Sequence, residues 1–277
     1  ILANFVNAGL NWVLIFGKLG APALGALGSG YATAVSQWFM FGAMLWLGRD
    51  AVRGHWLGWR ERLTWRSLGR VLGMGSSLGF QTGLEVWAFH AAGLMIGSLG
   101  AVPLAAHAIA MSLATLSFMV PAGLSAAAAT RVGHLVGAGF AWARTARIAV
   151  GLGVGVMVLP ALAFVLAPRL LVGVYTSDAG VVALAATLLP LAGAFQLFDG
   201  TQVVAFGVLR GAGDVHVPSA ANMIGYWLVG LPVGWLLGFR LDLGAPGVWV
   251  GLVLSLAVIA VLLLARIGWV LRRARLL

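Results

Sequence analysis

Two carboxylates stand inside long apolar segments of this chain, where an acidic side chain is costly. Glu85 lies within segment 79–89, and Asp199 lies within segment 191–201. An acid at the centre of a membrane-spanning helix costs roughly 2.5–3.5 kcal/mol on insertion scales. Two such costs in one chain indicate a function, and the usual functions are the handling of ions, protons or other cations.

Each acid has a polar neighbour on the same expected helix face. Gln81 precedes Glu85 by four residues, and Gln202 follows Asp199 by three, spacings that bring side chains together on an α-helix. An ionised acid holds a cation, and protonation or sodium competes with that cation, which is the exchange an antiporter needs. Nearby aromatic rings offer cation–π faces to an organic cation, although each ring can equally pack between helices or face lipid: Trp87, Phe89, Phe118, Phe195 and Phe198.

The two acids are expected at similar depths in the membrane. Glu85 follows the basic residue Arg70 by 15 positions, and Asp199 precedes Arg210 by 11. At 1.5 Å per residue these separations are roughly 22 and 16 Å from one membrane surface. The difference is about one helical turn, so both acids can line one cavity near the midplane.

The composition indicates a chain that lipid must cover. Hydrophobic residues make up 61% and charged residues 9%, whereas a soluble domain carries about 25% charged residues. No cysteine is present, which excludes disulfides and thiol chemistry. Since a bilayer core needs ~20 apolar residues per helix, the sequence predicts eight spans, at 1–16, 29–47, 71–97, 104–130, 145–166, 179–208, 217–238 and 245–268.

The basic residues fall mainly in alternate loops between these spans. Fourteen of the 17 lie between spans two and three, between spans four and five, after span six, or at the end of the chain. The opposite loops hold only Lys18, Arg169 and Arg240. This asymmetry predicts that the Arg-rich loops and both chain ends lie in the cytoplasm. It also accounts for the net charge of +10 without a nucleic-acid partner.

The start of the chain and one internal repeat predict a longer parent protein. The chain begins at Ile1, without Met, inside an apolar run, and no signal peptide is recognisable. Leu-Gly-Ala-Pro occurs at 19–22, after span one, and again at 243–246, after span seven. The match equates spans one and two with spans seven and eight. It therefore predicts a six-helix repeat whose first copy lacks four helices, as in transporters built from repeated halves.

Several ordered segments resemble the multidrug and toxic-compound extrusion (MATE) family, specifically its bacterial NorM-like branch. The resemblance covers nearly the whole chain, and the ordered set is more specific than any single piece. It rests on Asn11–Gly17 with Leu19–Pro22, Leu104–His107, Met119–Ser125, Thr130–Gly133, Gly207–Asp214, Tyr226-Trp227 and Gly230–Gly234.

The resemblance implies an all-α polytopic membrane protein that contains family helices five to twelve. The family fold is two six-helix bundles facing each other, with the substrate path between them. Residues 1–47 would be the last two helices of the N-terminal bundle, 48–70 a cytoplasmic Arg-rich linker, and 71–277 the complete C-terminal bundle. Glu85 and Asp199 match the Glu and Asp that the NorM-like branch carries in its second bundle.

Three positions depart from the family pattern. The tyrosine expected one turn before the Asp is Phe195, the Gln of an Ala-His-Gln-Ile pattern is Ala108, and a common Asn is Ser112. Sodium needs several neutral oxygen ligands, whereas a proton needs only a carboxylate. We therefore favour proton over sodium coupling, and we keep Phe195 and Ser112 in the expected binding site with the two acids and their glutamines.

The predicted function is export of cationic amphipathic drugs by alternating access, coupled to H⁺ or Na⁺. A monomer in the bacterial inner membrane is expected, in contact with lipid, with no cofactor, no metal site and no enzymatic activity. Two alternatives remain open. A related flippase of lipid-linked sugars would line its cavity with several arginines. An intramembrane aspartyl protease would pair Asp199 with Asp214 of the Gly211–Asp214 segment, although Asp214 is better placed in a turn.

Overall fold

The structure is a computed structural model that describes residues 2–50 and 64–273. The chain forms two compact units, residues 1–70 and 71–277. Within the described ranges the regular secondary structure is entirely helical, which confirms the predicted all-α class. The predicted linker 48–70 falls largely outside these ranges, because residues 51–63 are not described.

Residues 2–50 of the first unit contain two helices that pack against each other. They are α1 (Leu2–Phe16) and α2 (Ala26–Leu47). Gly28 on α2 lies against the backbone carbonyl of Leu14 on α1, so closely that a Cβ at this position would collide with it. The glycine thus allows the two helices to approach at this crossing, a common device in membrane proteins.

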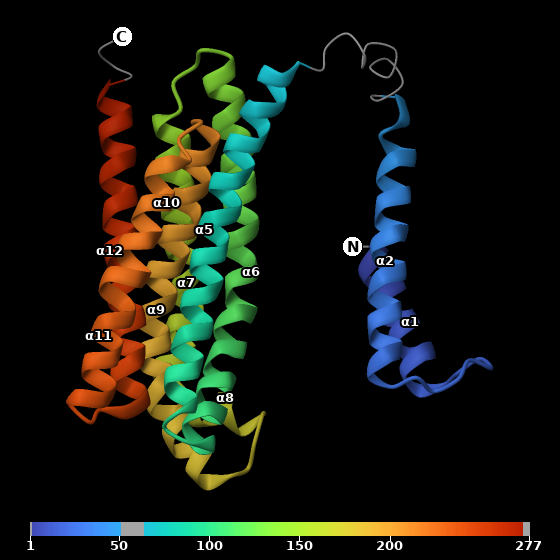
Figure 1. Cartoon of the computed structure of the whole chain (residues 1–277), viewed down its shortest axis with the longest axis vertical. Coiled ribbons are helices and arrows are strands. Elements are labelled where there is room, and N and C mark those ends of the chain that lie inside the picture. The colour runs from blue at the N-terminus through green and yellow to red at the C-terminus, as the bar shows by residue number, and fades with distance from the viewer. Residues whose placement is uncertain (1, 51–63, 274–277) are drawn as a thin grey trace. The chain divides into compact units, whose positions relative to one another are not determined.

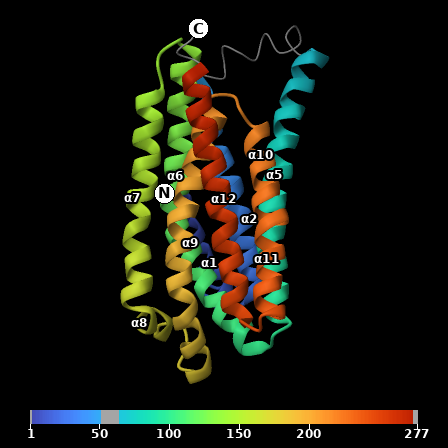
Figure 2. The ribbon, with the colours of Figure 1, turned by 90° about the vertical axis from the view of Figure 1, so that its left-hand side faces the viewer.

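The second unit is a bundle of long helices that run side by side (Figures 1 and 2). Its elements in chain order are α5 (Trp65–Gly97), α6 (Ala101–Gly137), α7 (Ala143–Leu166), the short α8 (Pro168–Gly173), α9 (Ala179–Gly211), α10 (His216–Asn222), η2 (Met223–Gly230), α11 (Leu231–Trp235), η3 (Leu236–Arg240) and α12 (Gly244–Arg273). The elements from α10 to η3 form one continuous helical segment in which η2 and η3 have π winding.

Helix α9 is the core of this bundle and packs against α6, α7 and α12. Small residues make the close contacts. Gly207 lies against the backbone and hydroxyl of Ser125 on α6, and Gly200 lies against Gly153 and Met157 on α7. Backbone approach of this kind favours helix association within lipid. Because α9 is surrounded, Asp199 at its middle is only 5% exposed.

Five described helical segments are long and apolar enough to cross a membrane: Ala101–Gly137, Ala143–Leu166, Ala179–Gly211, His216–Arg240 and Gly244–Arg273. Helix α1 is apolar but has only 15 residues. Helices α2 and α5, with 22 and 33 residues, are long but less apolar. The eight predicted segments all correspond to helical segments, but hydropathy and length together support five of them.

Several predicted spans are shorter than the helices that the structure contains. Helix α6 continues to Gly137, so Arg131 lies within a helix and not in a loop. Helix α5 likewise begins at Trp65, before the predicted start at 71. The hydropathy pattern stops where the first charged side chain appears. The helix continues because its backbone hydrogen bonds do not depend on apolar side chains.

Candidate functional site

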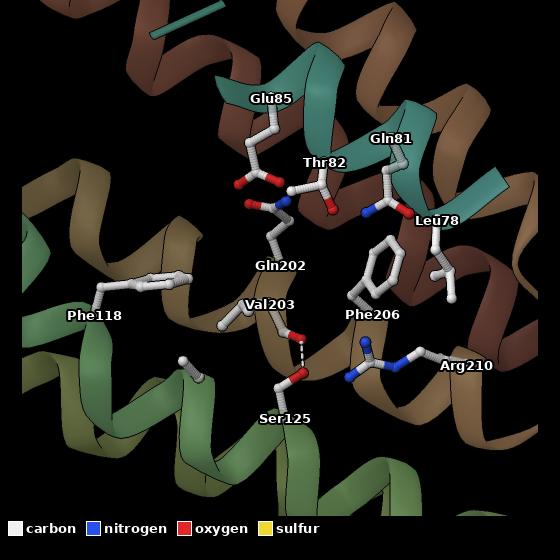
Figure 3. Close-up of a pocket in the computed structure, with 11 residues that line it drawn as sticks. Leu78, Gln81, Thr82, Glu85, Phe118, Ser125, Gln202, Val203, Phe206 and Arg210 are labelled. Atoms are coloured by element: carbon white, nitrogen blue, oxygen red, sulfur yellow. Dashed lines mark hydrogen bonds between the residues drawn. The ribbon is translucent and has the colours of Figure 1, made fainter. Parts of the chain in front are cut away.

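Helix α5 carries three polar side chains that line a cavity of the second unit. Gln81, Thr82 and Glu85 lie within about one helical turn (Figure 3). Gln81 is 5% exposed and Glu85 is partly buried. Since Gln81 and Glu85 are four residues apart, the helix places them on one face, as the sequence predicted.

The carboxylate of Glu85 receives donors from a helical segment far along the chain. The amide Nδ2 of Asn222 donates to Oε2 at 3.4 Å, and the hydroxyl of Tyr226 donates to Oε1, also at 3.4 Å. The amide of Gln202 on α9 faces the same carboxyl group (Figure 3). Three neutral groups from two other segments therefore surround Glu85, as expected for a carboxylate held away from bulk water.

Three of the amide groups in this region leave a buried oxygen without a hydrogen-bond donor. These oxygens are Oε1 of Gln81, Oε1 of Gln202 and Oδ1 of Asn222. Two of these amides, those of Gln202 and Asn222, use their N–H groups on the carboxylate of Glu85, which leaves their oxygens without a donor. A buried acceptor without a donor is costly. The oxygens of Gln81 and Gln202 are therefore candidate ligands for a cation, because both residues also line a cavity.

Glu85 lines two cavities of the second unit. The first, here called the polar cavity, has a volume of about 260 Å³ and is lined by Gln81, Thr82, Glu85, Ser125, Gln202 and Arg210 among others. Figure 3 shows these side chains around it. The second, here called the aromatic cavity, has a volume of about 370 Å³, and its walls include Glu85, Asp199, Phe89, Met111, Phe118 and Phe195.

Asp199 approaches the site from α9, the buried helix of the bundle. It lines the aromatic cavity together with Glu85, so the structure brings the two predicted acids to one cavity wall. Phe195, one turn earlier, is 2% exposed and lines the same cavity. Its ring packs edge-on against Phe89, at 5.9 Å between centroids, and against Trp249, at 5.7 Å.

The aromatic side chains named from the sequence divide into two groups. Phe89, Phe118 and Phe195 line the aromatic cavity. Trp87 is 63% exposed on the outside of α5, and Phe198 packs against the apolar core. Only the first group can therefore present a ring to a ligand in this cavity.

Ser112 is the predicted site residue that the structure does not bring to the others. Its side chain is exposed, and its hydroxyl donates to the carbonyl of Ala108 at 2.8 Å within α6. It lines neither the polar nor the aromatic cavity. Two nearby residues of α6, Met111 and Thr115, line the aromatic cavity instead.

Sequence reasoning missed Asn222, Tyr226 and Thr82 as site residues. Asn222 and Tyr226 bind Glu85 directly, and Thr82 lines both cavities. One signal was available, since Asn222 and Tyr226 are two polar side chains four residues apart in an apolar segment. Nothing in the sequence, however, pairs that segment with α5.

Asp214 is not a second aspartate beside Asp199. It lies in the turn after α9, and its Oδ2 accepts a hydrogen bond from Nε of Arg266 on α12 at 2.6 Å. Asp199 lies 12 residues before the end of α9, which is about 18 Å along the helix axis. The two carboxylates therefore cannot share one water molecule, as an aspartyl protease requires. In the described part of the chain, no three His, Asp or Glu side chains form a metal-binding group.

Comparison with known proteins supports a transporter fold. Multidrug resistance protein NorM of Burkholderia vietnamiensis is 43% identical over 267 residues, which are 93% of this chain and 57% of that protein. Probable multidrug resistance protein NorM of Mesorhizobium japonicum is 43% identical over 279 residues, 97% of this chain and 59% of that protein. The chain thus spans less than two thirds of the length of these relatives.

Solved structures show the same architecture. The eukaryotic MATE transporter AtDTX14 is 26% identical, with a TM-score of 0.74 over 99% of this chain and 62% of that chain. The Vibrio cholerae MATE transporter VcmN in its bent form shares the fold, with a TM-score of 0.78 at 18% identity over 99% of this chain and 61% of that chain. The profile of the MatE family matches residues 77–236, more than half of the chain and the part that holds both acids. This chain is a membrane protein that belongs to the MatE family.

Proposed function

We propose that this chain is the larger part of a multidrug efflux transporter that exchanges an amphipathic organic cation for a proton or a sodium ion. The names of the bacterial relatives, which describe multidrug resistance, support the substrate class. The chain spans 57% to 59% of those relatives, so the activity proposed is that of the whole protein.

One observation carries this proposal, namely that Glu85 borders both cavities. The polar cavity offers amide oxygens to a small cation, and the aromatic cavity offers rings and a second carboxylate to an organic cation. A single carboxylate cannot neutralise two cations at full strength. Binding in one cavity therefore weakens binding in the other, which is the competition that antiport requires.

Asp199 has the complementary role of a second negative charge for the organic cation. It faces only the aromatic cavity, beside Phe195. A cation within about 6 Å of an aromatic ring gains cation–π energy, and more when it is desolvated. The arrangement suits ligands that are positively charged and largely apolar.

The coupling ion is proposed to be a proton or a sodium ion. The sequence favoured a proton because Phe195, Ala108 and Ser112 remove neutral oxygens. The unpaired oxygens of Gln81 and Gln202, both residues of the polar cavity, are neutral oxygens that this reasoning did not count. They support the sodium alternative and give it residues to test.

The residues that line the two cavities give little support to the flippase alternative. Arg210, in the last turn of α9, is the one arginine among the residues that line them. A cavity for a lipid-linked sugar phosphate would be expected to offer several cations. The proposal further places the protein in the bacterial inner membrane as a monomer, with the Arg-rich loops in the cytoplasm.

Binding of tetraphenylphosphonium, an apolar organic cation, to a purified transporter that includes this chain, in detergent, tests the proposal. We expect Glu85→Gln and Asp199→Asn each to weaken binding tenfold or more, because charge-assisted contacts contribute about 1.5–3 kcal/mol. Asp242→Asn is the matched control, since Asp242 is an exposed loop carboxylate. Unchanged affinity in both cavity variants would remove the basis of the proposal.

A further inference from the structure

The segment that holds Asn222 and Tyr226 against Glu85 has an unusual winding. Residues Met223–Gly230 form a π-helix, η2, and the N–H of Leu231 bonds to the carbonyl of Tyr226, five residues earlier. A π-helix takes about one residue more per turn than an α-helix, and such turns are frequently found at functional sites. Residues five apart therefore lie nearly one above the other on η2.

A pair of residues five apart, one at the end of α10 and one in η2, joins this segment to α5. Asn222 donates to Glu85, and Nε1 of Trp227 donates to the backbone carbonyl of Leu84 at 3.1 Å. Leu84 is the residue immediately before Glu85. In an α-helix, positions five apart point about 140° away from each other, so ordinary winding would not direct both side chains at the same part of α5.

A second pair of residues five apart joins the other side of η2 to α12. Gly225 and Gly230 both lie against Ser255, so closely that a Cβ on Gly225 would meet the carbonyl of Ser255 and one on Gly230 its side chain. Neither glycine has room for a larger residue. The two pairs, Asn222 with Trp227 and Gly225 with Gly230, repeat the same spacing on two faces of one segment.

We propose that the π winding of η2 is the device that positions Glu85 for cation binding, with Trp227 as a positioning residue. Gly225 and Gly230 fix η2 on α12, and the winding then directs Asn222, Tyr226 and Trp227 together at α5. Trp227 acts on the backbone next to Glu85 and does not touch the cation. This inference rests on the proposed function of Glu85.

Disulfide formation tests the winding directly, because the chain has no cysteine of its own. Met223 and Leu228 are five apart on η2 and are 47% and 64% exposed. Five residues of α-helix rise about 7.5 Å, and cysteines whose Cα atoms are more than about 7 Å apart do not bridge. We expect Met223→Cys with Leu228→Cys to cross-link under a membrane-permeant oxidant. Arg147→Cys with Leu152→Cys, five apart on the regular helix α7, should stay reduced.

The positioning role is tested by tetraphenylphosphonium affinity. Trp227→Phe keeps an aromatic ring but removes the N–H donor, and we expect affinity to fall about threefold to tenfold, the contribution of one hydrogen bond. Trp227→His, which retains a ring N–H, should recover part of the loss. Trp235→Phe, a half-exposed tryptophan of α11, is the matched control and should bind normally.

The outcomes separate this inference from the proposed function. Absence of the 223–228 cross-link, or normal affinity of Trp227→Phe, overturns the positioning role while Glu85→Gln still weakens binding. Normal affinity of Glu85→Gln overturns the proposed function itself. A loss of thermal stability in Trp227→Phe with unchanged affinity would assign Trp227 a structural role only and so contradict the inference.

Discussion

Tyr226 donates its hydroxyl to Oε1 of Glu85 from a segment 141 residues further along the chain. The family resemblance had implied a tyrosine at position 195, where Phe195 instead packs its ring against Trp249. The phenol next to the acids is thus supplied by a different helix. The ring of Tyr226 also packs edge-on against Phe89, at 5.5 Å between centroids, which holds it beside the aromatic cavity.

Removal of this phenol should weaken cation binding without unfolding the protein. Tyr226→Phe keeps the contact with Phe89 but removes the donor, and a net hydrogen bond contributes about 0.5–1.5 kcal/mol. We expect about a twofold to tenfold loss of tetraphenylphosphonium affinity, measured by equilibrium dialysis. Tyr175→Phe, a half-exposed tyrosine after α8, should bind as the unmodified chain does. Equal affinity of the two variants would show that the phenol is not used.

The Asp214–Arg266 ion pair should contribute to stability. The pair is short at 2.6 Å, its side chains are 15% and 28% exposed, and the guanidinium also lies over the ring of Trp269 at 4.3 Å. Asp214→Asn leaves Arg266 partly buried without its partner. We expect a loss of about 1–3 kcal/mol, below the 3–5 kcal/mol typical of fully buried pairs, seen as a lower melting temperature in detergent.

The exposed pair of Arg49 and Asp50 provides the contrast to Asp214 and Arg266. Its atoms are 3.8 Å apart and its side chains are 51% and 80% exposed. Surface pairs contribute about 0–1 kcal/mol, so Asp50→Asn should leave the melting temperature nearly unchanged. Exchange of the charges, Asp214→Arg with Arg266→Asp, should recover part of the stability that Asp214→Asn loses. If Asp214→Asn and Asp50→Asn changed the melting temperature equally, the shorter ion pair would contribute no more stability than the exposed one.

The packing of α9 on α6 should depend on Gly207. A Cβ at this position would collide with the backbone of Ser125, whereas a Cβ at Gly151 on α7 meets open space. Gly207→Ala must separate the two helices and should lower stability by about 1–3 kcal/mol, the usual cost of overpacking. Gly151→Ala should be neutral or slightly stabilising, because alanine favours helix. Thermal unfolding of both variants in one detergent compares them, and a neutral Gly207→Ala would contradict the close contact.

The orientation predicted from the basic residues can be checked with single cysteines. Phe140, in the loop between α6 and α7, is 67% exposed, and Val174, after α8, is 81% exposed. In intact cells an impermeant maleimide should label Val174→Cys and leave Phe140→Cys unlabelled until the membrane is opened. The reverse pattern would place the Arg-rich loops outside and refute the assignment.

The coupling ion should be identified in proteoliposomes that contain a transporter including this chain. We expect a pH gradient without sodium to drive tetraphenylphosphonium transport, because Glu85 and Asp199 supply carboxylates that a proton can neutralise. A strict sodium requirement, unaffected by collapse of the pH gradient, would overturn this expectation. It would instead favour ligand roles for the unpaired oxygens of Gln81 and Gln202 in the polar cavity, and Gln81→Leu should then abolish sodium dependence.

The features that depend on the membrane were predictable from the sequence. An acid in an apolar segment is conspicuous because lipid offers it no hydrogen bonds. Glu85 and Asp199 were therefore identified, and the structure brings them to one cavity. Gln81 and Gln202 followed from helical spacing alone, and both line the polar cavity.

Position on a helix face was less predictable where the helix had no clear polar stripe. Ser112 was expected in the site because the family pattern places an amide there. On α6 its side chain is exposed, and its hydroxyl donates a hydrogen bond to the carbonyl of Ala108 on the same helix. Sequence similarity carries the order of residues but not the rotation of a helix about its axis. That rotation is set by close contacts such as Gly207 against Ser125.

The sequence by itself determined the membrane setting, the helical segments, the two acids and the family of this protein, because each depends on residue type or local spacing. Only the tertiary structure decided which groups surround Glu85. Asn222 and Tyr226 lie 137 and 141 residues away, at the end of α10 and within η2. The reason is physical. Hydropathy depends on each residue's own type and carries no information about which helices will be neighbours. Helix neighbours and helix winding are set only when backbones pack together at glycines.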